Sequence, residues 1–541
     1  MKFCMVWKMM KTTGKMDRRE FLALSATGIL ASMVAACQGQ PARGAISTPT
    51  ATSRLKADPT VQVTPADADW SALANRLQGT LVLPDSSQYF TALQLFDTQF
   101  DSIHPAAIAY CASPADVQQC LAFARHFNLP LAARCGGHSY AGYSTTTGLV
   151  IDVTRMNTVS VDTTAGTATI GGGSRLVDVY SALTQHGVLI PAGSCPTVGI
   201  AGLTLGGGAG VIGRKFGLTC DSLLSAQLVL ADGSILTCDA NNHPDLFWAL
   251  RGGGGGNFGV VTSFTFQTYT VSQLAIFTLD WPWSNAIEVV DAWQHWAPQA
   301  PDELWSNCLL LTNSGASQPT VRVNGVYVGN TTSLNPLLQQ LTSQINTSPS
   351  DNYVYNETPF DTMMIEAGCY GKSVAACHLP TQNPQGTLQR DTAAAKSDYF
   401  TSLLPRAGIQ VLVNAIAQRQ ASSTPGTGGI GMDAYGGAIN RVAPDATAFV
   451  HRNALFSAQY NAGWQANASP SVVTANRAWL VSTWQAMRSY ASGQAYQNYI
   501  DPDLPNWLQA YYGANLPRLQ SIKALYDPYN LFHFKQSIPP A

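Results

Sequence analysis

A histidine that follows two glycines is the first feature of this sequence with chemical potential. Residues 134–140 read RCGGHSY and come directly after an apolar run at residues 129–133, which is typical of a strand. Glycines after a strand let successive backbone N–H groups form a concavity that binds anions such as phosphate. An imidazole beside that concavity, here His138, reaches a ring joined to the phosphate. Taken alone, the motif also fits an ordinary turn.

A cysteine stands near the start of a second glycine-rich stretch. Residues 193–210 read GSCPTVGIAGLTLGGGAG, with Cys195 in third place, and residues 251–259 read RGGGGGNFG. Taken singly, the first segment also fits a buried thiol in a flexible loop, and the second also fits a low-complexity linker.

Several common enzyme classes are excluded by their missing motifs. The chain has no GxxxxGK[ST] of P-loop NTPases, and its glycine runs lack the strand, GxGxxG, helix and acidic-residue order of a nicotinamide-binding Rossmann unit. It also has no HExxH, GxSxG or CxxC, which argues against zinc proteases, α/β-hydrolases and a dithiol or metal site.

The order of the three glycine-rich motifs, and the sequence around them, resembles the vanillyl-alcohol oxidase / p-cresol methylhydroxylase superfamily of FAD enzymes. Within it the match is to the berberine-bridge-enzyme-like oxidases. The resemblance covers the chain from about Asp67 to Pro540 and includes residues 511–515 (YYGAN), 527–532 (DPYNLF) and 536–540 (QSIPP). It implies a two-domain α+β protein, with a PCMH-type FAD-binding domain and a substrate domain built on an antiparallel sheet covered by helices.

In that family the histidine of RxGGH bonds the flavin 8α-methyl carbon, and the cysteine of GxCxxVGxxG bonds flavin C6. The resemblance therefore implies FAD held covalently by His138 and Cys195, and the altered electronics make such a flavin a stronger hydride acceptor. The first two glycine-rich segments are expected to cradle the diphosphate, and the third to pack along the adenosine and ribityl end. The further cofactor contacts expected are Arg134, Gly136, Gly137, Ser139, Thr197, Val198, Gly199, Gly202, Gly207, Gly208, Gly210, Asn257, Gly259, Val261, Asn498 and Asn530. No metal site is expected.

The resemblance also implies the catalytic residues. Residues 496–501 (YQNYID) match the family's YxNYxD segment, whose second tyrosine, here Tyr499, is the catalytic base of its sugar oxidases and cannabinoid synthases. A phenol titrates near pH ~10, so Tyr499 needs a hydrogen-bond relay or a nearby positive charge to take a proton at neutral pH. Asp433 matches a carboxylate that partners this tyrosine; because its charge raises the phenol pKa, its expected role is to accept or orient a proton. Tyr140 matches a second active-site tyrosine, and Gln459 is expected to bind substrate hydroxyls.

The expected reaction is hydride transfer from an alcohol carbon of the substrate to flavin N5. Val198 falls where the family controls dioxygen access, and its small side chain favours an oxidase that releases hydrogen peroxide. The favoured substrate is a carbohydrate hydroxyl, such as the anomeric hydroxyl of an oligosaccharide. Three alternatives stay open: oxidative tailoring of an alkaloid, polyketide or phenolic metabolite, a dehydrogenase with another electron acceptor, and a flavin-bearing binding protein with little turnover.

The N-terminus predicts an exported protein. Arg18 and Arg19 precede an apolar run at residues 21–36, which is too short to span a membrane comfortably and resembles a twin-arginine export signal. Residues 34–37 (VAAC) resemble a lipobox, which would attach a lipid anchor to Cys37; in the alternative, ordinary cleavage leaves Cys37 unmodified. We therefore expect a cell-envelope lipoprotein or a secreted protein. An oxidising destination permits disulfides, and Cys369 and Cys377 are either a late disulfide or two buried thiols.

Composition excludes one class of partner. Charged residues make up 11% of the chain and the formal net charge is -2, so no basic excess exists to hold a nucleic-acid backbone.

Local patterns predict the elements that carry these motifs. Ser113 and Pro114 mark the start of a helix, and Ser174 is expected to cap a second helix that Gly187 ends. The other elements expected are a strand at 149–153, a hairpin with an Asp-Gly turn at 228–236, helices at 286–296 and 332–345, and strands at 309–311 and 321–328. The expected domains are a signal at 1–37, a linker at 38–66, the FAD-binding domain at 67–270, the substrate domain at 271–480, and a segment at 481–541 that completes the FAD domain.

Overall fold

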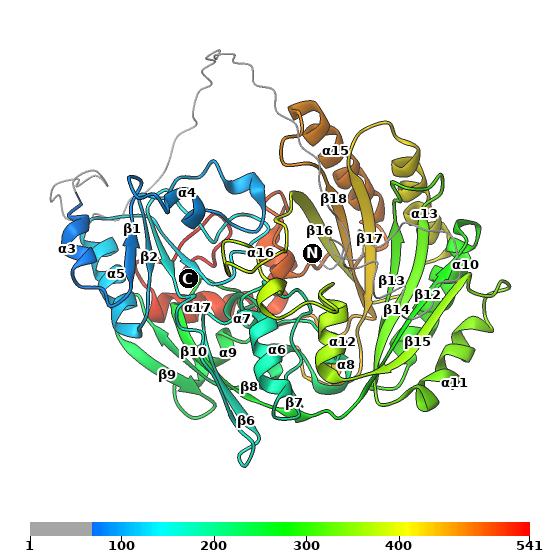
Figure 1. Cartoon of the computed structure of the whole chain (residues 1–541), viewed down its shortest axis with the longest axis horizontal. Coiled ribbons are helices and arrows are strands. Elements are labelled where there is room, and N and C mark those ends of the chain that lie inside the picture. Colours follow the sequence, from blue (N-terminus) through cyan, green and yellow to red (C-terminus); the bar gives the residue numbers. More distant parts are fainter. Residues whose placement is uncertain (1–67) are drawn as a thin grey trace.

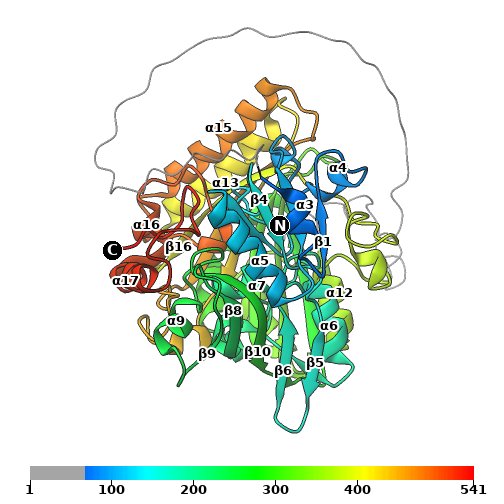
Figure 2. The same cartoon turned by 90° about the vertical axis from the view of Figure 1, so that its left-hand side faces the viewer.

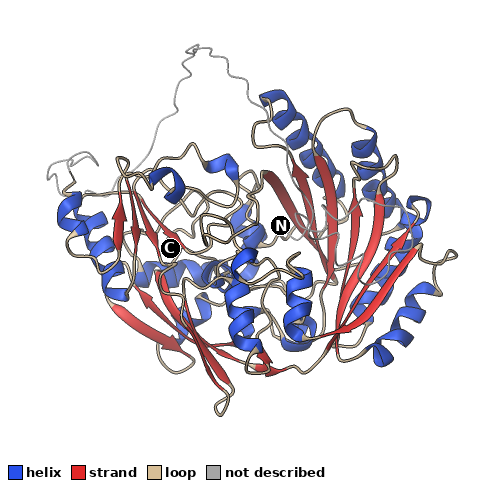
Figure 3. Cartoon of the chain, viewed as in Figure 1, coloured by secondary structure: helices blue, strands red, loops and turns tan. Residues whose placement is uncertain are grey.

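The computed structural model describes residues 68–541 (Figure 1). The expected export signal, the linker and Cys37 therefore lie outside the described residues. Helices and strands are mixed along the described chain, which confirms the α+β class (Figure 3). Among residues 68–541, no helix combines the length and the apolar character needed to cross a membrane.

The first sheet is built around a parallel βαβ unit. β2 (Ala107–Tyr110), β4 (Leu149–Asp152) and β3 (Leu131–Arg134) run parallel, and β1 (Thr80–Val82) pairs antiparallel with β2. α5 (Pro114–His126) connects β2 to β3, with Ser113 as its N-cap and Pro114 at its start, as the sequence predicts. Because β3 ends at Arg134, the segment that carries His138 leaves the sheet at its carboxyl edge.

A second, antiparallel sheet follows in the order β5, β6, β10, β8, β9. The predicted hairpin is present, since Val229 pairs with Ile235 and Gly233 adopts a φ of 90° in the turn. The strands are β5 (Val159–Asp162), β6 (Thr167–Gly171), β8 (Leu223–Val229), β9 (Ile235–Asp239) and β10 (Val260–Gln267), and a small pair is formed by β7 (Val188–Leu189) and β11 (Tyr269–Thr270).

The helix that Ser174 was expected to cap begins later. α6 spans Leu176–Thr184, its N-cap is Arg175, and no side chain caps it. The cause is a contact made before the helix: the Ser174 carbonyl accepts from the Ile200 amide, and Arg175 forms a β-bridge with Gly199. This stretch is therefore held extended against the cysteine-bearing loop. Gly187 lies in the turn after α6 with a φ of 69°.

A seven-stranded antiparallel sheet dominates the second half of the molecule (Figure 1). Its order is β15 (Asp351–Glu357), β12 (Leu274–Trp281), β14 (Thr320–Val328), β13 (Leu304–Leu311), β17 (Thr427–Ala434), β18 (Phe456–Gly463) and β16 (Ala393–Phe400). Helices α10 (Ala286–Trp296), α11 (Thr331–Thr342), α13 (Arg406–Ala421) and α15 (Pro470–Met487) cover one of its faces. The predicted antiparallel sheet covered by helices is thus present.

The other face of this sheet carries polar side chains toward the first half. Alternation along β18 places Phe456, Ala458 and Tyr460 in the core under the helices, so Gln459 points the opposite way. Asp433 of β17 pairs with Ser457 of β18 and therefore shares the face of Gln459.

The C-terminal segment returns to the first half. α17 (Leu516–Tyr526) packs on α9 (Pro244–Ala249), as Figure 2 shows. The Ile538 amide donates to the Asn257 side chain, which ties the last residues to the third glycine-rich loop. The expected boundary at residue 480 falls inside α15, which packs on β16 and β18, so the layer that covers the sheet continues to Met487.

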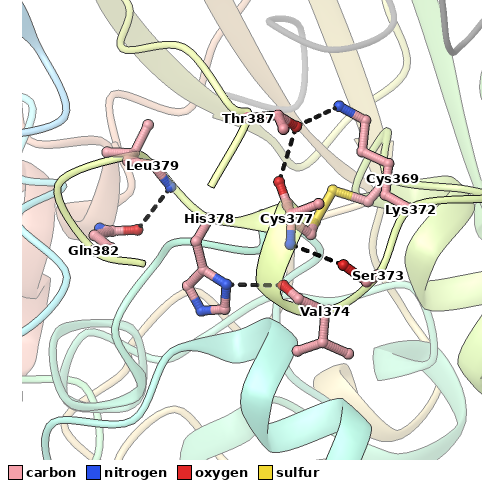
Figure 4. Close-up of a disulfide and its surroundings, with 10 residues drawn as sticks. Cys369, Lys372, Ser373, Val374, Cys377, His378, Leu379, Gln382 and Thr387 are labelled. Carbon is pink, nitrogen blue, oxygen red and sulfur yellow. Dashed lines mark hydrogen bonds between the residues drawn. A yellow bond between two sulfur atoms is a disulfide. The ribbon is translucent and has the colours of Figure 1, made fainter. Parts of the chain in front are cut away.

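Short elements complete the connections. They are α3 (Trp70–Ala74), α4 (Tyr89–Ala92), α7 (Ile200–Leu205), α8 (Gly213–Phe216), α12 (Pro359–Glu366), α14 (Ala438–Arg441), α16 (Trp507–Tyr512) and the 3-10 turn η9 (Gln497–Tyr499). In the loop after α12, Cys369 and Cys377 form a disulfide (Figure 4). Of the two states that the sequence leaves open for this pair, the structure contains the bonded one.

Candidate functional site

A cavity of about 480 Å³ lies between the glycine-rich loops and the returning C-terminal segment. It is lined mainly by residues from 131–146, 193–209, 255–261, 496–500 and 532–534. Among the described residues, none from 271–480 lines it. The cavity is therefore a property of the first half and the C-terminal segment, and the seven-stranded sheet meets it only at the end where Tyr140 and Tyr499 lie.

Glycine backbones hold the first two loops together. A Cβ added to Gly136 would lie 2.3 Å from the Gly199 amide nitrogen, and one added to Gly199 would lie 2.1 Å from Cys135 Sγ. Only glycine allows two chains to approach this closely. The contact brings the loop of His138 and the loop of Cys195 to one cavity, and both side chains line it.

The His138 ring is fixed by two contacts. Its Nε2 lies 2.8 Å from Thr197 Oγ1, and the Phe96 ring stacks on it at a centroid distance of 4.2 Å and an angle of 21°. Loss of solvation, with a smaller effect of Arg175, lowers the pKa of His138 to about 3. The imidazole is therefore neutral at physiological pH, the state in which one ring nitrogen keeps its lone pair.

Most of the expected cofactor-contacting residues line the cavity with His138 and Cys195. They are Arg134, Gly136, Gly137, Ser139, Val198, Gly199, Gly202, Gly259, Val261 and Asn498.

The expected residues that do not line the cavity are Thr197, Gly207, Gly208, Gly210, Asn257 and Asn530. Three of the glycines serve packing between protein segments instead. A Cβ on Gly208 would lie 2.2 Å from Thr219 Oγ1, one on Gly210 would lie 1.9 Å from the Ala192 oxygen, and one on Gly207 would meet the Phe449 ring.

The two asparagines outside the lining shape the chain, and Thr197 contacts the site through His138. Asn257 donates to Gly253 O and accepts from the Ile538 amide, so it joins two segments. Asn530 adopts a φ of 52° in the turn after α17, a conformation that asparagine tolerates better than most residues.

The cavity fits a long ligand with an anionic or hydrogen-bond-accepting part. Gly202 is exposed to it, and a Cβ added there would meet no described atom within 4 Å. Arg134 lines the cavity and pairs through Nε with Asp152, while its Nη1 is buried without a hydrogen-bond partner among the described residues. A guanidinium in the lining, beside glycine backbones whose N–H groups can form an anion-binding concavity, suits the phosphates and polar atoms of FAD.

Tyrosines close the end of the cavity that faces the sheet. The rings of Tyr140 and Tyr499 stack with centroids 5.7 Å apart and an angle of 9°. Gln459 of β18 donates from Nε2 to the Tyr140 hydroxyl over 2.8 Å. The sheet, the His138 loop and the C-terminal segment therefore converge on one pair of phenols.

Tyr496 was not predicted from the sequence as a site residue, although it opens the same YxNYxD motif. Its ring meets that of Tyr499 edge-on at 4.9 Å, and its hydroxyl oxygen accepts from the Gly208 amide at 2.9 Å and from Asn498 Nδ2 at 3.0 Å. These bonds anchor η9 to the second glycine-rich loop and so hold Tyr499 in place in the cavity lining.

The electrostatics of Tyr499 oppose simple ionisation. Burial, followed by the charge of Asp433, raises the pKa of Tyr499 well above its ordinary value. After burial, the groups with the largest effects on this phenol are Asp433 and the neighbouring tyrosines, and each of them raises its pKa. Within residues 68–541, no group of three or more His, Cys, Asp or Glu side chains is arranged to hold a metal ion.

Comparison with known proteins places two family models on this site. Residues 105–239 match an FAD binding domain, and residues 495–539 match a model described as berberine and berberine like. The first span contains both His138 and Cys195, and the second contains Tyr496 and Tyr499.

Similarity to individual proteins extends over most of the chain. The FAD-linked oxidoreductase YgaK of Bacillus subtilis is 35% identical over 86% of this chain and 98% of its own. The solved structure of Physcomitrella patens BBE-like 1 is 33% identical with a TM-score of 0.79, covering 87% of this chain and 99% of that one. A chitooligosaccharide oxidase structure is 28% identical with a TM-score of 0.77, covering 87% of this chain and 99% of that one.

Proposed function

The chain belongs to the berberine-bridge-enzyme-like family of FAD-linked oxidoreductases, and we propose that it oxidises an alcohol carbon of a carbohydrate, with dioxygen as the electron acceptor and hydrogen peroxide as the second product. The observation that carries this proposal is the stacked pair Tyr140–Tyr499 at the mouth of the FAD cavity, with Gln459 bonded to one phenol and Asp433 acting on the other.

His138 and Cys195 are the proposed covalent anchors of FAD. When bound, FAD supplies a two-electron acceptor for the hydride that leaves the substrate carbon. The two side chains line one cavity on loops that touch through Gly136 and Gly199. A cofactor held from both loops keeps one position relative to Tyr499, and a fixed near-attack geometry accounts for a large part of rate enhancement.

Tyr499 is the proposed proton acceptor for the substrate hydroxyl. Because its pKa is raised, it acts as a relay: the phenol oxygen takes the substrate proton while the phenol proton passes toward Asp433. Tyr140 and Gln459 form a hydrogen-bonded pair at 2.8 Å that can orient neighbouring hydroxyls of the substrate. A substrate rich in hydroxyls fits this polar face better than a purely aromatic one.

Two features support the sugar and the oxidase assignments over their alternatives. A chitooligosaccharide oxidase shares this fold over nearly its whole length, and Val198 lines the cavity with a small side chain beside the Cys195 loop. Tailoring of an alkaloid, polyketide or phenolic metabolite, and a dehydrogenase with another electron acceptor, remain the alternatives to be tested.

Export is the proposed fate of the chain, with a lipid on Cys37 as the proposed anchor. These residues lie outside the described part of the structure. The Cys369–Cys377 disulfide supports the proposal, because disulfides persist mainly in oxidising compartments.

A substrate screen tests the proposed function directly. Purified holoenzyme is mixed with mono- and oligosaccharides and with aromatic alcohols, and flavin bleaching without oxygen and peroxide release in air are both recorded. Bleaching and peroxide with sugars support the proposal. Bleaching with sugars but sluggish reoxidation in air, rescued by quinones, makes the protein a dehydrogenase. A flavin that stays oxidised with every sugar overturns the carbohydrate assignment.

A further inference from the structure

Thr197 lies behind the cavity wall and yet contacts its most reactive side chain. Only 1% of Thr197 is exposed, and it does not line the cavity. Its Oγ1 lies 2.8 Å from His138 Nε2. The Phe96 ring stacks on the His138 ring at a centroid distance of 4.2 Å. The hydrogen bond and the stacking together fix the orientation of the imidazole.

The partner atom decides which ring nitrogen carries the proton. In a neutral imidazole one nitrogen is a donor and the other an acceptor, and the hydrogen bond made by one sets the character of the other. The Thr197 backbone also hydrogen-bonds the His138 ring and raises its pKa, against the larger effect of burial. When Thr197 Oγ1 accepts the proton of Nε2, the lone pair of the neutral ring lies on Nδ1.

We propose that Thr197 is the positioning residue for covalent attachment of FAD: it holds the Nε2–H form of His138 and thereby presents Nδ1 as the nucleophile toward the flavin 8α carbon. This inference rests on the proposed His138 anchor.

The chemistry balances with dioxygen as the oxidant. The 8α-methyl group loses one proton, and the electron pair of that C–H bond moves into the isoalloxazine ring system, which is thereby reduced by two electrons. The Nδ1 lone pair forms the new C–N bond, and the ring then releases the Nε2 proton to solvent. Dioxygen takes the two electrons and two protons, which gives hydrogen peroxide and the oxidised, linked cofactor. As the bond forms, positive charge develops on the ring, and the Thr197 oxygen stabilises it through the Nε2–H bond.

The test uses the full chain with Cys195→Ala, so that only the His138 bond can retain flavin. Three further changes are compared in this background: Thr197→Val, which removes the hydroxyl at nearly constant volume, Thr197→Ser, which keeps it, and Thr204→Val as a matched control. Thr204 is equally buried, and its hydroxyl has no partner among the described residues. Each protein is incubated with FAD in air, and the flavin that stays on the denatured chain is measured over time.

We expect Thr197→Val to slow covalent retention by about 10-fold or more, the size of effect seen when the partner that orients a metal-bound imidazole is lost. Thr197→Ser should restore the rate, and Thr204→Val should match its parent. The second readout is the isomer of the histidyl flavin in tryptic digests: the parent should contain the Nδ1 isomer alone, and Thr197→Val should contain both isomers, which a merely structural role would not produce.

Two outcomes separate this inference from the proposal on which it rests. If the Cys195→Ala parent retains no flavin after denaturation, the His138 anchor itself is wrong. If the parent retains flavin and Thr197→Val does so at the same rate and with the same single isomer, the role of Thr197 is overturned while the anchor stands.

Discussion

Tyr140 and Tyr499 stack almost parallel, at a centroid distance of 5.7 Å, although they come from opposite ends of the chain. Tyr140 follows the glycine turn that carries His138, and Tyr499 ends the turn η9 of the C-terminal segment. Gln459 from the seven-stranded sheet bonds the Tyr140 hydroxyl. Three separate parts of the sequence thus meet at this pair. The two rings can stack only when all three parts are correctly folded.

Removing one hydroxyl from this pair tests the proposed relay. We expect Tyr499→Phe to slow anaerobic flavin reduction by a factor on the order of 10² to 10⁴, the usual contribution of a positioned acid or base. The ring and its stacking remain, so flavin content and thermal stability should stay close to the parent. Stopped-flow absorbance at the flavin band measures the rate. Tyr140→Phe is the control, with a smaller effect because that phenol only orients; equal rates for Tyr499→Phe and the parent would remove Tyr499 from the mechanism.

Neutralising Asp433 should change the pH dependence of the same step. The Asp433 carboxylate raises the Tyr499 pKa, and in the proposed relay it accepts the phenol proton. Asp433→Asn therefore lowers the Tyr499 pKa but removes the acceptor, and the reduction rate at pH 7 falls. In the variant the reaction depends on ionised phenol, so its rate should rise about tenfold per pH unit below the phenol pKa, whereas the parent should be nearly flat above neutrality. Ser457→Ala, which alters the neighbouring position of β18, should keep the parent profile.

Gly202 offers a test of the cavity as the cofactor site. A side chain there meets no described atom within 4 Å and projects into the cavity. We expect Gly202→Leu to lower the ratio of flavin to protein strongly while apoprotein unfolding is unchanged, and Gly202→Ala to have a smaller effect. Gly199→Ala is the contrasting change, because its Cβ would overlap Cys135 Sγ and should disturb the fold itself. Full flavin content in Gly202→Leu would place the cofactor elsewhere.

Local motifs, once they were matched together to a known family, were sufficient to predict that His138 and Cys195 belong to one site. His138 and Cys195 stand in short signatures, and both line the same cavity. The helix-covered antiparallel sheet was implied by the family resemblance, and the amphipathic pattern gave α10 its predicted bounds. These features depend on neighbours in sequence, which a pattern can contain.

Contacts between distant segments could not be predicted in the same way. A glycine run indicates that something approaches the backbone closely, but not what it is. At Gly208 and Gly210 the neighbours are Thr219 and the Ala192 carbonyl, and neither glycine lines the cavity. The late start of α6 likewise depends on a bridge between Arg175 and Gly199, and the stacking of Phe96 on His138 has no local signature.

A buried histidine outside the cavity should make stability depend on pH. His451 is fully buried, stacks on Tyr399 at 4.3 Å, and bonds Gln494. Burial lowers its pKa to about 4. In the unfolded chain the pKa of His451 is ~6.5, so between pH 4 and that value the unfolded state binds one more proton than the folded state. The contribution of neutral His451 to the free energy of unfolding is therefore complete above pH ~6.5 and is lost as the pH falls toward 4.

The loss attributable to His451 is about 3 kcal/mol over that interval, from the 1.36 kcal/mol that each pKa unit represents. Urea titrations at several pH values should therefore show a steeper acid decline for the parent than for His451→Asn, even though the variant is less stable at pH 7. If the free energy of unfolding declines equally with pH in the two proteins, the pKa of His451 does not differ between the folded and unfolded states.

The buried pair Lys396–Asp501 should couple the sheet to Tyr499. Lys396 of the edge strand β16 lies 2.5 Å from the Asp501 carboxylate, and both side chains are almost fully buried. Asp501 comes two residues after Tyr499. Within residues 68–541, Lys396 is its one ion-pair partner. Lys396→Met leaves this carboxylate buried and unpaired, which typically costs about 3 to 5 kcal/mol. It should also slow flavin reduction, because the segment that carries Tyr499 loses its tie to the sheet.

The double change Lys396→Met with Asp501→Asn separates the charge from the packing. Without either charge no unpaired ion is buried, so we expect the double variant to be more stable than Lys396→Met alone. Arg441→Ala is the control at an exposed pair with Asp302, where screening by solvent should make the loss of stability small. Urea unfolding measures all of these variants. If the single and double changes cost the same free energy, the two side chains do not interact, and the stability of the Tyr499 segment must come from its bonds to the glycine-rich loop, such as that from the Gly208 amide to Tyr496.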